Sequence, residues 1–404
     1  MNQRIAVAGL IVLVAGMSPP DEARAGEETV QPDRSIVGHV QELVALQDAL
    51  LAGEQSAIAD YRKVKISVGR KILASPDAVF KEPANMIAAV RYLLMGGIAH
   101  VGRKAILAAK VEGEQRLLLE GATAFSAGRT GAARIRFTKL DALKVSPAIA
   151  GNLALAQGVV QGKVESKSAE AIRYYNQALL LAPGTLIAES ALRHLVTTPL
   201  VAKRMKRLKR VASRYLRRFE GSVFSRAFRR SFVTAFVNLP ELSEGDRQWL
   251  VALLASRKST IRIGYALEIA REGLIAGKLE LVETANSIST HSEIDEPSER
   301  TRYELYTTVA SALEDFSPSQ AVEIRALSGE NLARADRKIL GASQALAKAI
   351  VSRPKLPGSK GHADQDAKAE PPKGASQDGP EFPGLATTKR ARRLISTADQ
   401  LMKE

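Results

Sequence analysis

The strongest constraint on the fold of this chain is a succession of helix-periodic, Ala/Leu-rich segments separated by short glycine-containing joints. Three joints of similar composition stand between two such segments: Ala52-Gly53-Glu54, Ala127-Gly128-Arg129 and Ala276-Gly277-Lys278. Because glycine readily adopts the left-handed conformation that ends many helices, each joint predicts the end of one helix before the start of the next. Alternating β-branched runs and Asn-Gly turns, which would indicate strands, are almost absent. The sequence therefore predicts an all-α fold of helical hairpins in series.

The composition favours thin helix–helix layers and excludes cysteine chemistry. Aromatic residues make up 5% of the 404 residues, so the core must be built mainly from Leu, Ala, Ile and Val. The chain has no cysteine. This absence excludes disulfide bonds, a thiolate nucleophile and Cys-ligated zinc or iron–sulfur sites.

The clearest repeat unit lies between residues 171 and 183. Ala171, Tyr175 and Ala178 share one helical face, where the small alanines let a neighbouring helix approach closely. Pro183 then ends the helix, and the whole pattern resembles the second helix of a tetratricopeptide repeat (TPR). A weaker unit precedes it, formed by Leu118, Gly121, Gly128, Ala133 and Phe137. We therefore predict a degenerate, TPR-like solenoid of stacked helical hairpins with a long concave surface, and a plain helical bundle is the alternative.

The first 25 residues have the pattern of a secretory signal peptide. Arg4 provides a positive start and residues 5–17 form an uncharged apolar run. Ala23 and Ala25 then place small residues before a cleavage site at Gly26. The apolar run is shorter than the roughly 20 residues that span a bilayer, and an uncleaved anchor helix is the alternative. We predict an exported, periplasmic protein that has no stable membrane span after cleavage.

The rest of the chain is predicted to have three parts. Residues 26–352 carry the helical periodicity and form the TPR-like body. Residues 353–385 contain six of the 17 prolines and few large apolar residues, which predicts a disordered Pro/Gly-rich linker. Residues 386–404 return to a helical pattern with an apolar edge and a basic start, so we expect a short amphipathic terminal helix there.

Most of the positive charge lies in one block. The formal net charge of the chain is +15, and residues 203–230 contain twelve Lys and Arg residues against one acid, Glu220. An apolar stripe at helical spacing makes this block a predicted basic helix, with Met205, Leu208, Ala212, Tyr215 and Phe219. We predict that its bases bind an acidic partner: Lys203, Arg204, Lys206, Arg207, Lys209, Arg210 and Arg214. A solvated face without a partner is the alternative, and nucleic acid is not an expected partner because the protein is predicted to be exported.

No set of residues in the sequence predicts catalysis, a metal site or a cofactor. The five histidines are isolated, and motifs such as H-x-x-x-H, G-x-S-x-G and the phosphate-binding glycine loops do not occur. Glu189-Ser190 is similar to the Glu-Ser pair of lytic transglycosylases, but the downstream segment of that family is missing. We expect Glu189 to be a helix-surface residue that pairs with Arg193. The protein is thus predicted not to be an enzyme, and a periplasmic cell-wall-processing enzyme or a TPR-like adaptor is the alternative.

Four segments make the chain similar to the MotC family of periplasmic motility proteins: residues 91–97 (RYLLMGG), 120–129 (EGATAFSAGR), 182–193 (APGTLIAESALR) and 217–224 (RRFEGSVF). With the signal peptide and the proline-rich tail, the resemblance covers nearly the whole chain. It implies a non-enzymatic protein of the α-proteobacterial flagellar motor. It further implies binding to the periplasmic domain of the stator subunit MotB and support of motor rotation, and it leaves other periplasmic motor components open as partners.

Overall fold

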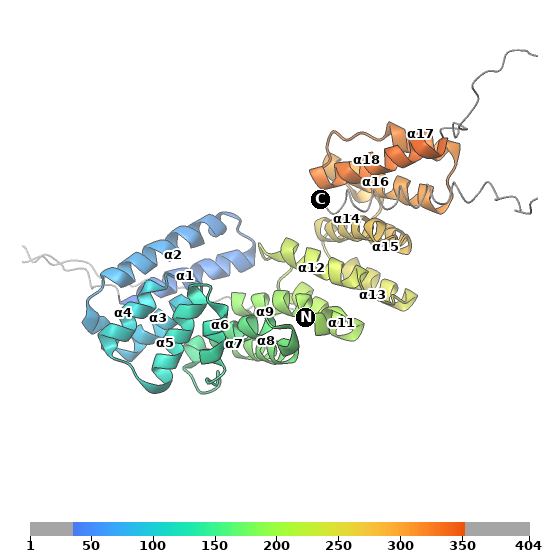
Figure 1. Ribbon diagram of the computed structural model, residues 1–404. Helices are drawn as coiled ribbons and strands as arrows, with labels where there is room; N and C mark the ends of the chain where they lie inside the picture. Colours follow the sequence, from blue (N-terminus) through green and yellow to red (C-terminus); the bar gives the residue numbers. More distant parts are fainter. Residues whose placement is uncertain (1–34, 352–404) are drawn as a thin grey trace, which may run out of the picture.

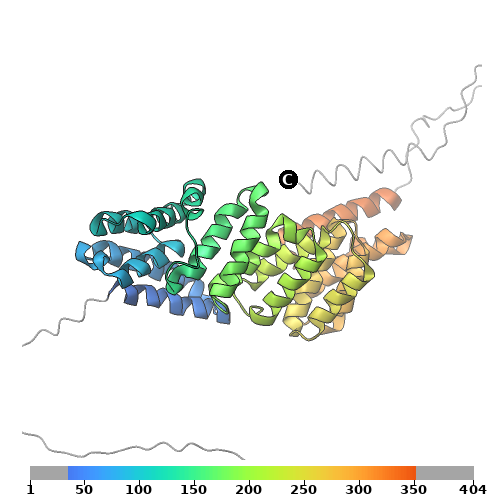
Figure 2. The same ribbon diagram turned by 90° about the horizontal axis from the view of Figure 1, so that it is seen from below.

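The computed structural model describes residues 35–351, and this part of the chain consists of eighteen α-helices and three short 3₁₀-helices without any strand. The helices form hairpins that stack side by side into an elongated body, which runs from α1 and α2 at one end to α17 and α18 at the other (Figure 1, Figure 2). The prediction of an all-α fold of stacked helical hairpins is therefore confirmed. The predicted signal peptide with Ala23, Ala25 and Gly26, the linker at 353–385 and the helix at 386–404 lie outside the described residues.

The first half of the stack contains four hairpins. Their elements are α1 (Ile36–Ala52), α2 (Ser56–Ala74), η1 (Asp77–Lys81), α3 (Pro83–Leu94), α4 (His100–Ala109), α5 (Gly113–Ser126), α6 (Thr130–Phe137), α7 (Pro147–Gly162), η2 (Glu165–Lys167) and α8 (Ser168–Leu181). The second half continues with α9 (Leu186–Thr197), α10 (Pro199–Ala202), α11 (Met205–Arg218), α12 (Ser225–Val237), α13 (Glu244–Ala255), α14 (Ser259–Ile275), α15 (Glu280–Ile288), η3 (His291–Glu293), α16 (Pro297–Glu314), α17 (Pro318–Ala326) and α18 (Arg334–Val351).

Proline and glycine set many of the helix boundaries. Proline has no N–H to lose at the first position of a helix. Five helices begin in this way, at Pro83, Pro147, Pro199, Pro297 and Pro318. The three predicted joints follow the ends of α1, α5 and α14, and each has its glycine in the left-handed conformation: Gly53, Gly128 and Gly277. The joints therefore act as predicted.

Two neighbouring hairpins close through a glycine in the first helix and an aromatic ring in the second. In the α5/α6 hairpin a Cβ on Gly121 would lie 2.5 Å from the Phe137 ring. In the α7/α8 hairpin a Cβ on Gly158 would lie 2.5 Å from the Tyr175 ring. The predicted repeat unit is therefore a pair of helices that approach closely because one of them has no side chain at the contact point.

The first helices of successive hairpins form a continuous spine. Helix α7 packs on α9, α9 on α12, α12 on α14 and α14 on α16. A single core cluster extends from Ile36 to Leu340, and a small second cluster lies between α16, α17 and α18. Each hairpin thus covers its apolar stripe by contact with the hairpins before and after it, as in other helical-repeat proteins.

Helix α1 joins the start of the stack to its middle. It packs on α2, α3 and α9. It also contacts the segment that connects α11 and α12, where the Val223 N–H donates to the Leu50 carbonyl of α1 at 3.0 Å. Gly53 follows with a φ of 94°, and a Cβ on it would lie 2.4 Å from the Gly221 carbonyl oxygen. Position 53 therefore requires glycine both for its backbone conformation and for this close contact.

We expect Gly53→Ala to lower the free energy of unfolding by about 2 kcal/mol or more, because alanine is strained at this φ and its Cβ would collide with backbone. Gly128→Ala is the matched control. Its φ is 72°, but nothing lies within 4 Å of the added Cβ, so the expected loss is about 1 kcal/mol. Urea denaturation followed by circular dichroism measures both losses. Equal losses would show that the contact with Gly221 adds nothing.

Candidate functional site: a basic helix and an adjacent apolar pocket

Helix α11 is amphipathic, and its apolar stripe lies where the sequence predicts it. Leu208, Ala212 and Tyr215 are fully buried, Phe219 is 4% exposed and Met205 is half-buried. The buried side of the helix packs against α9 and α12. The basic side chains therefore project from the remaining faces of α11.

The seven basic residues of the predicted partner-binding site fall into two groups. Five of them are exposed: Lys203, Arg204, Lys206, Arg210 and Arg214. The other two are partly buried and have partners within the fold. The Arg207 guanidinium donates to the Leu200 carbonyl at 3.3 Å, and Lys209 Nζ pairs with Asp246 Oδ1 at 2.8 Å. Lys209 therefore ties α11 to α13, whereas the five exposed bases are accessible to a partner.

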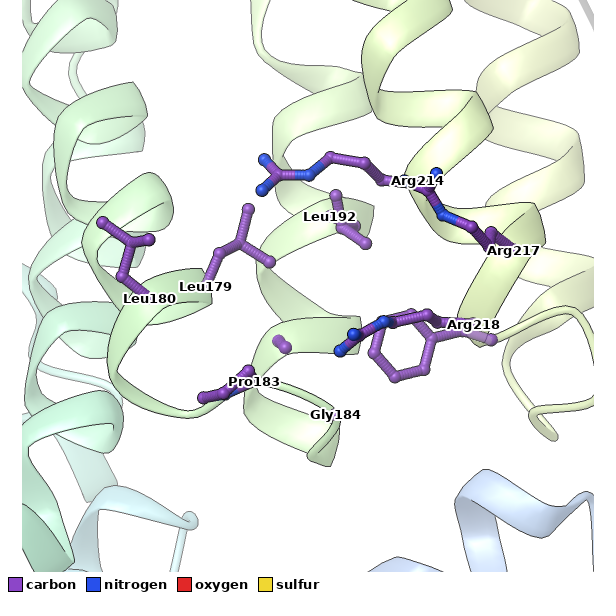
Figure 3. A pocket seen from close by; sticks show the side chains of 10 residues that line it. Leu179, Leu180, Pro183, Gly184, Leu192, Arg214, Arg217 and Arg218 are labelled. Atoms are coloured by element: carbon purple, nitrogen blue, oxygen red, sulfur yellow. The ribbon is translucent and has the colours of Figure 1, made fainter.

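An open pocket of about 460 Å³ lies beside the C-terminal half of α11, between this helix, α8 and α9 (Figure 3). Its lining is mostly apolar but includes three arginines: Leu179, Leu180, Pro183, Gly184, Ala188, Leu192, Arg214, Arg217, Arg218 and Phe219. Figure 3 shows Arg214 and Arg218 extending from α11 across the pocket toward α8 and the turn at Pro183.

The turn between α8 and α9 shapes one wall of the pocket. Helix α8 ends at Leu181, two residues before Pro183, and Gly184 then redirects the chain with a φ of 77°. The Thr185 hydroxyl donates to the Ala182 carbonyl at 2.7 Å and stabilises the turn. Leu180 lies on the outer side of the last turn of α8, where 76% of its surface is exposed. An apolar side chain thus stands in solvent at the rim of the pocket.

The arginines of the pocket carry charge that no carboxylate of the described chain compensates. All three are exposed, and none of them forms an ion pair within residues 35–351, although Arg257 nearby pairs with Glu220. Arg217 and Arg218 also lie in the last turn of α11, where the helix dipole favours positive charge by up to about 1 kcal/mol. That interaction stabilises the helix but leaves the guanidinium N–H donors available to a ligand.

Glu189 of α9 is a buried charge next to the pocket, and our expectation that it lies on a helix surface is wrong. Its side chain is 0% exposed. The predicted pair with Arg193 is present, since Arg193 Nε donates to both carboxylate oxygens at 2.8 Å. The Tyr215 hydroxyl of α11 donates to Glu189 Oε1 at 2.7 Å. Burial raises the pKa of Glu189, while Arg193 and Tyr215 favour the carboxylate and act in the opposite direction.

The Glu189 network joins three helices and positions the basic residues of the pocket. The Tyr215 ring stacks on Phe228 of α12 with 3.6 Å between the ring centroids. Arg193 lies over the Phe224 ring, 4.6 Å from its centroid. Because Tyr215 follows Arg214 directly in the sequence, its hydrogen bond and its ring stack fix the turn of α11 that presents this arginine.

His194 of α9 serves as a packing group. Its ring stacks on Tyr175 of α8 with 5.4 Å between centroids. Burial, together with the nearby Arg193 and Lys163, lowers the pKa of His194 to about 4, so the ring is neutral at neutral pH.

Residues 35–351 contain neither a group of metal-ligating side chains nor a helix suited to crossing a bilayer. In this part of the chain no three His, Asp or Glu side chains are placed to hold a metal ion. None of its helices combines the length and the apolar composition that crossing a bilayer requires.

The predicted partner-binding site contains neither Arg217 and Arg218 nor the apolar residues of the pocket. The available signal was the run Leu179-Leu180-Leu181 before Pro183, because three consecutive leucines of one helix cannot all face the core. The proximity of this run to α11 depends on tertiary packing and has no local signal in the sequence.

The fold and the pocket define a helical-repeat protein with a basic, partly apolar surface. The family model described as "Chemotaxis protein MotC" matches residues 1–404. The chain belongs to the MotC family of chemotaxis proteins, which confirms the resemblance inferred from the sequence. It is 29% identical over 340 residues to the chemotaxis protein MotC of Rhizobium meliloti (strain 1021), and the alignment covers 82% of this chain and 75% of that relative. No solved structure matches this chain.

We expect Glu189→Gln to lower the free energy of unfolding by about 2 kcal/mol, because it removes the anion that compensates the partly buried Arg193. Glu170→Gln is the control, since it removes a more exposed carboxylate that pairs with Lys167 at 2.7 Å. The control should lose less than about 1 kcal/mol. Urea denaturation at neutral pH measures both variants. A loss for Glu189→Gln no larger than that of the control would contradict a structural role for this network.

Proposed function

We propose that this protein acts in the periplasm, where it binds the periplasmic domain of the flagellar stator subunit MotB and supports motor rotation. Membership of the MotC family supports a role in motility. The single observation that carries the binding part is the exposed basic face of α11 beside an apolar pocket. Helical-repeat proteins typically use such extended surfaces to hold partners. Other periplasmic components of the motor are further candidate partners.

The basic face of α11 first attracts an acidic surface of the partner. Lys206 and Arg210 are exposed, and charges of this kind raise association rates by electrostatic steering. The Lys209–Asp246 ion pair and the Glu189 network hold α11 in place, so its charges face the partner from a rigid support. Support of rotation is then conformational and steric, and no covalent step is part of the mechanism.

The alternative of a cell-wall-processing enzyme has no support in the geometry around Glu189. A general acid that cleaves a wall polymer must reach the substrate. Glu189 is fully buried, and both of its oxygens accept hydrogen bonds from within the fold. Its raised pKa is explained by burial and does not indicate catalysis.

Deletion of the gene tests the motility function directly. A protein that supports rotation acts on a motor that is already assembled, so the deletion strain should form filaments of normal length but fail to swim. The measurements are electron microscopy of the filaments and tracking of the cells, with the full-length chain supplied in trans as the control. Normal swimming of the deletion strain would overturn the proposal.

Charge reversal on α11 tests the steering role. We expect the triple variant Lys206→Glu, Arg207→Glu, Arg210→Glu to associate roughly tenfold more slowly with the purified periplasmic domain of MotB at low salt, and to show a flatter salt dependence. The control is Arg62→Glu, Lys63→Glu, Arg70→Glu, which makes the same change in net charge at exposed positions of α2. Stopped-flow or surface-plasmon kinetics measure the rates, and circular dichroism checks the helix content. A triple variant that is as salt-sensitive as the wild type would refute the steering role.

A further inference from the structure

The pocket beside α11 has two chemical features that a ligand could complement: exposed apolar surface and arginines without a carboxylate partner. One is apolar: Leu179, Leu180 and Leu192 line the pocket, and Leu180 is 76% exposed at its rim. Exposed apolar surface next to a concave site is typical of an interaction site. The volume of about 460 Å³ lies in the range of ligand pockets, roughly 300–1,000 Å³. An apolar side chain of a bound segment would fill this space and displace water from the leucines.

The second feature is charge. Arg214, Arg217 and Arg218 lie on one wall of the same pocket and have no carboxylate partner within residues 35–351. Figure 3 shows Arg214 and Arg218 reaching over the apolar lining. A guanidinium binds a carboxylate through two parallel hydrogen bonds, so this wall is complementary to a ligand with carboxylates spaced along it.

We propose that the pocket binds an acidic peptide segment of a partner protein, with a leucine-sized side chain in the apolar part and flanking carboxylates on Arg214, Arg217 and Arg218. The proposal deepens the proposed function and rests on it for the source of the segment, which is a periplasmic motor protein. It places the centre of the contact at the C-terminal half of α11. The exposed bases of the N-terminal half steer the partner but do not form the centre of the contact.

The geometry favours a peptide over other anions. Proteins that bind single-stranded nucleic acid stack the bases on exposed aromatic side chains. The one aromatic residue of this pocket, Phe219, is 4% exposed and cannot serve in that way. A lipid surface is flat and meets an amphipathic helix along its length. Here the apolar residues lie in a concavity between helices, and the apolar stripe of α11 is already buried in the core.

The experiment uses the full chain from Gly26 to Glu404 and fluorescein-labelled peptides in which two leucines stand between pairs of glutamates. Fluorescence anisotropy should show saturable binding of this peptide to the wild type. Arg217→Ala, Arg218→Ala should weaken the binding about tenfold or more, and Leu180→Ser should weaken it about threefold. The matched control is Arg62→Ala, Arg70→Ala, which removes the same charge from exposed positions of α2 outside the pocket, and its affinity should change less than about twofold.

Peptides with altered side chains separate the two features of the pocket. Exchange of the glutamates for glutamines and exchange of the leucines for serines should each weaken binding to the wild type. Three outcomes would each overturn the proposal: equal binding of the glutamine peptide, an unchanged affinity of Leu180→Ser, or an equal loss in the Arg62→Ala, Arg70→Ala control. Tighter binding of phosphatidylglycerol vesicles or of single-stranded DNA than of the peptide, lost in the Arg217→Ala, Arg218→Ala variant, would also overturn it.

Parallel measurements with the periplasmic domain of MotB distinguish this inference from the proposed function. If that domain binds the wild type and the pocket variants equally well, the pocket proposal fails while the proposed function stands. If the peptide binds in a pocket-dependent way but the MotB domain does not bind, the proposed partner is wrong while the pocket proposal stands. Circular dichroism checks that each variant keeps the helix content of the wild type. Leu180→Ser serves as a second, independent variant because it retains every arginine of the pocket.

Discussion

A helix of a globular protein can bury only a stripe of its surface, and this constraint determines how the described part of the chain is built. A hairpin covers the facing stripes of its two helices, but each hairpin has another apolar side that only its neighbours can cover. With 5% aromatic residues, the chain closes these contacts by close approach of backbones, as at Gly121 and Gly158. The core consequently extends from Ile36 to Leu340, and loss of any one hairpin would expose the hairpins on both sides of it.

At the junction of α9, α11 and α12, hydrogen bonds fix the orientation of the helices in addition to this apolar packing. A buried ion pair is seldom more stabilising than apolar side chains of equal size, because both charges lose their hydration. The role of Glu189 is therefore better explained by orientation, since its hydrogen bonds with Arg193 and Tyr215 permit one arrangement of α9 and α11. Helix α1 reaches the segment that follows α11 through the bond between Val223 and Leu50. Two independent contacts thus hold the part of the stack that presents the exposed positive charge.

The sequence predicts those features whose causes are local. The glycine joints and the face shared by Ala171 and Tyr175 depend on residues within one or two turns of helix, and the structure has them where they are predicted. The burial of Glu189 is different, because it depends on the packing of α9 against other helices, and its partner Tyr215 on α11 lies 26 positions away. The pocket was missed for the same reason: Leu179 and Arg218 come to line one pocket only after α8, α9 and α11 have packed. The basic helix and its buried apolar stripe could be predicted, but the apolar lining of the pocket beside it could not.

Helix α11 thus presents its charges in two physical settings. In its N-terminal half the exposed bases stand in water, where salt screens their attraction beyond about 8–10 Å and the main effect is on the rate of approach. At the pocket a bound segment displaces water from the arginines and the leucines together. Ion pairs strengthen when water is excluded, and the apolar contact does not weaken with salt. Charge alone would attract any polyanion, so the leucines next to the arginines are the feature that restricts the partner to a segment with both chemistries.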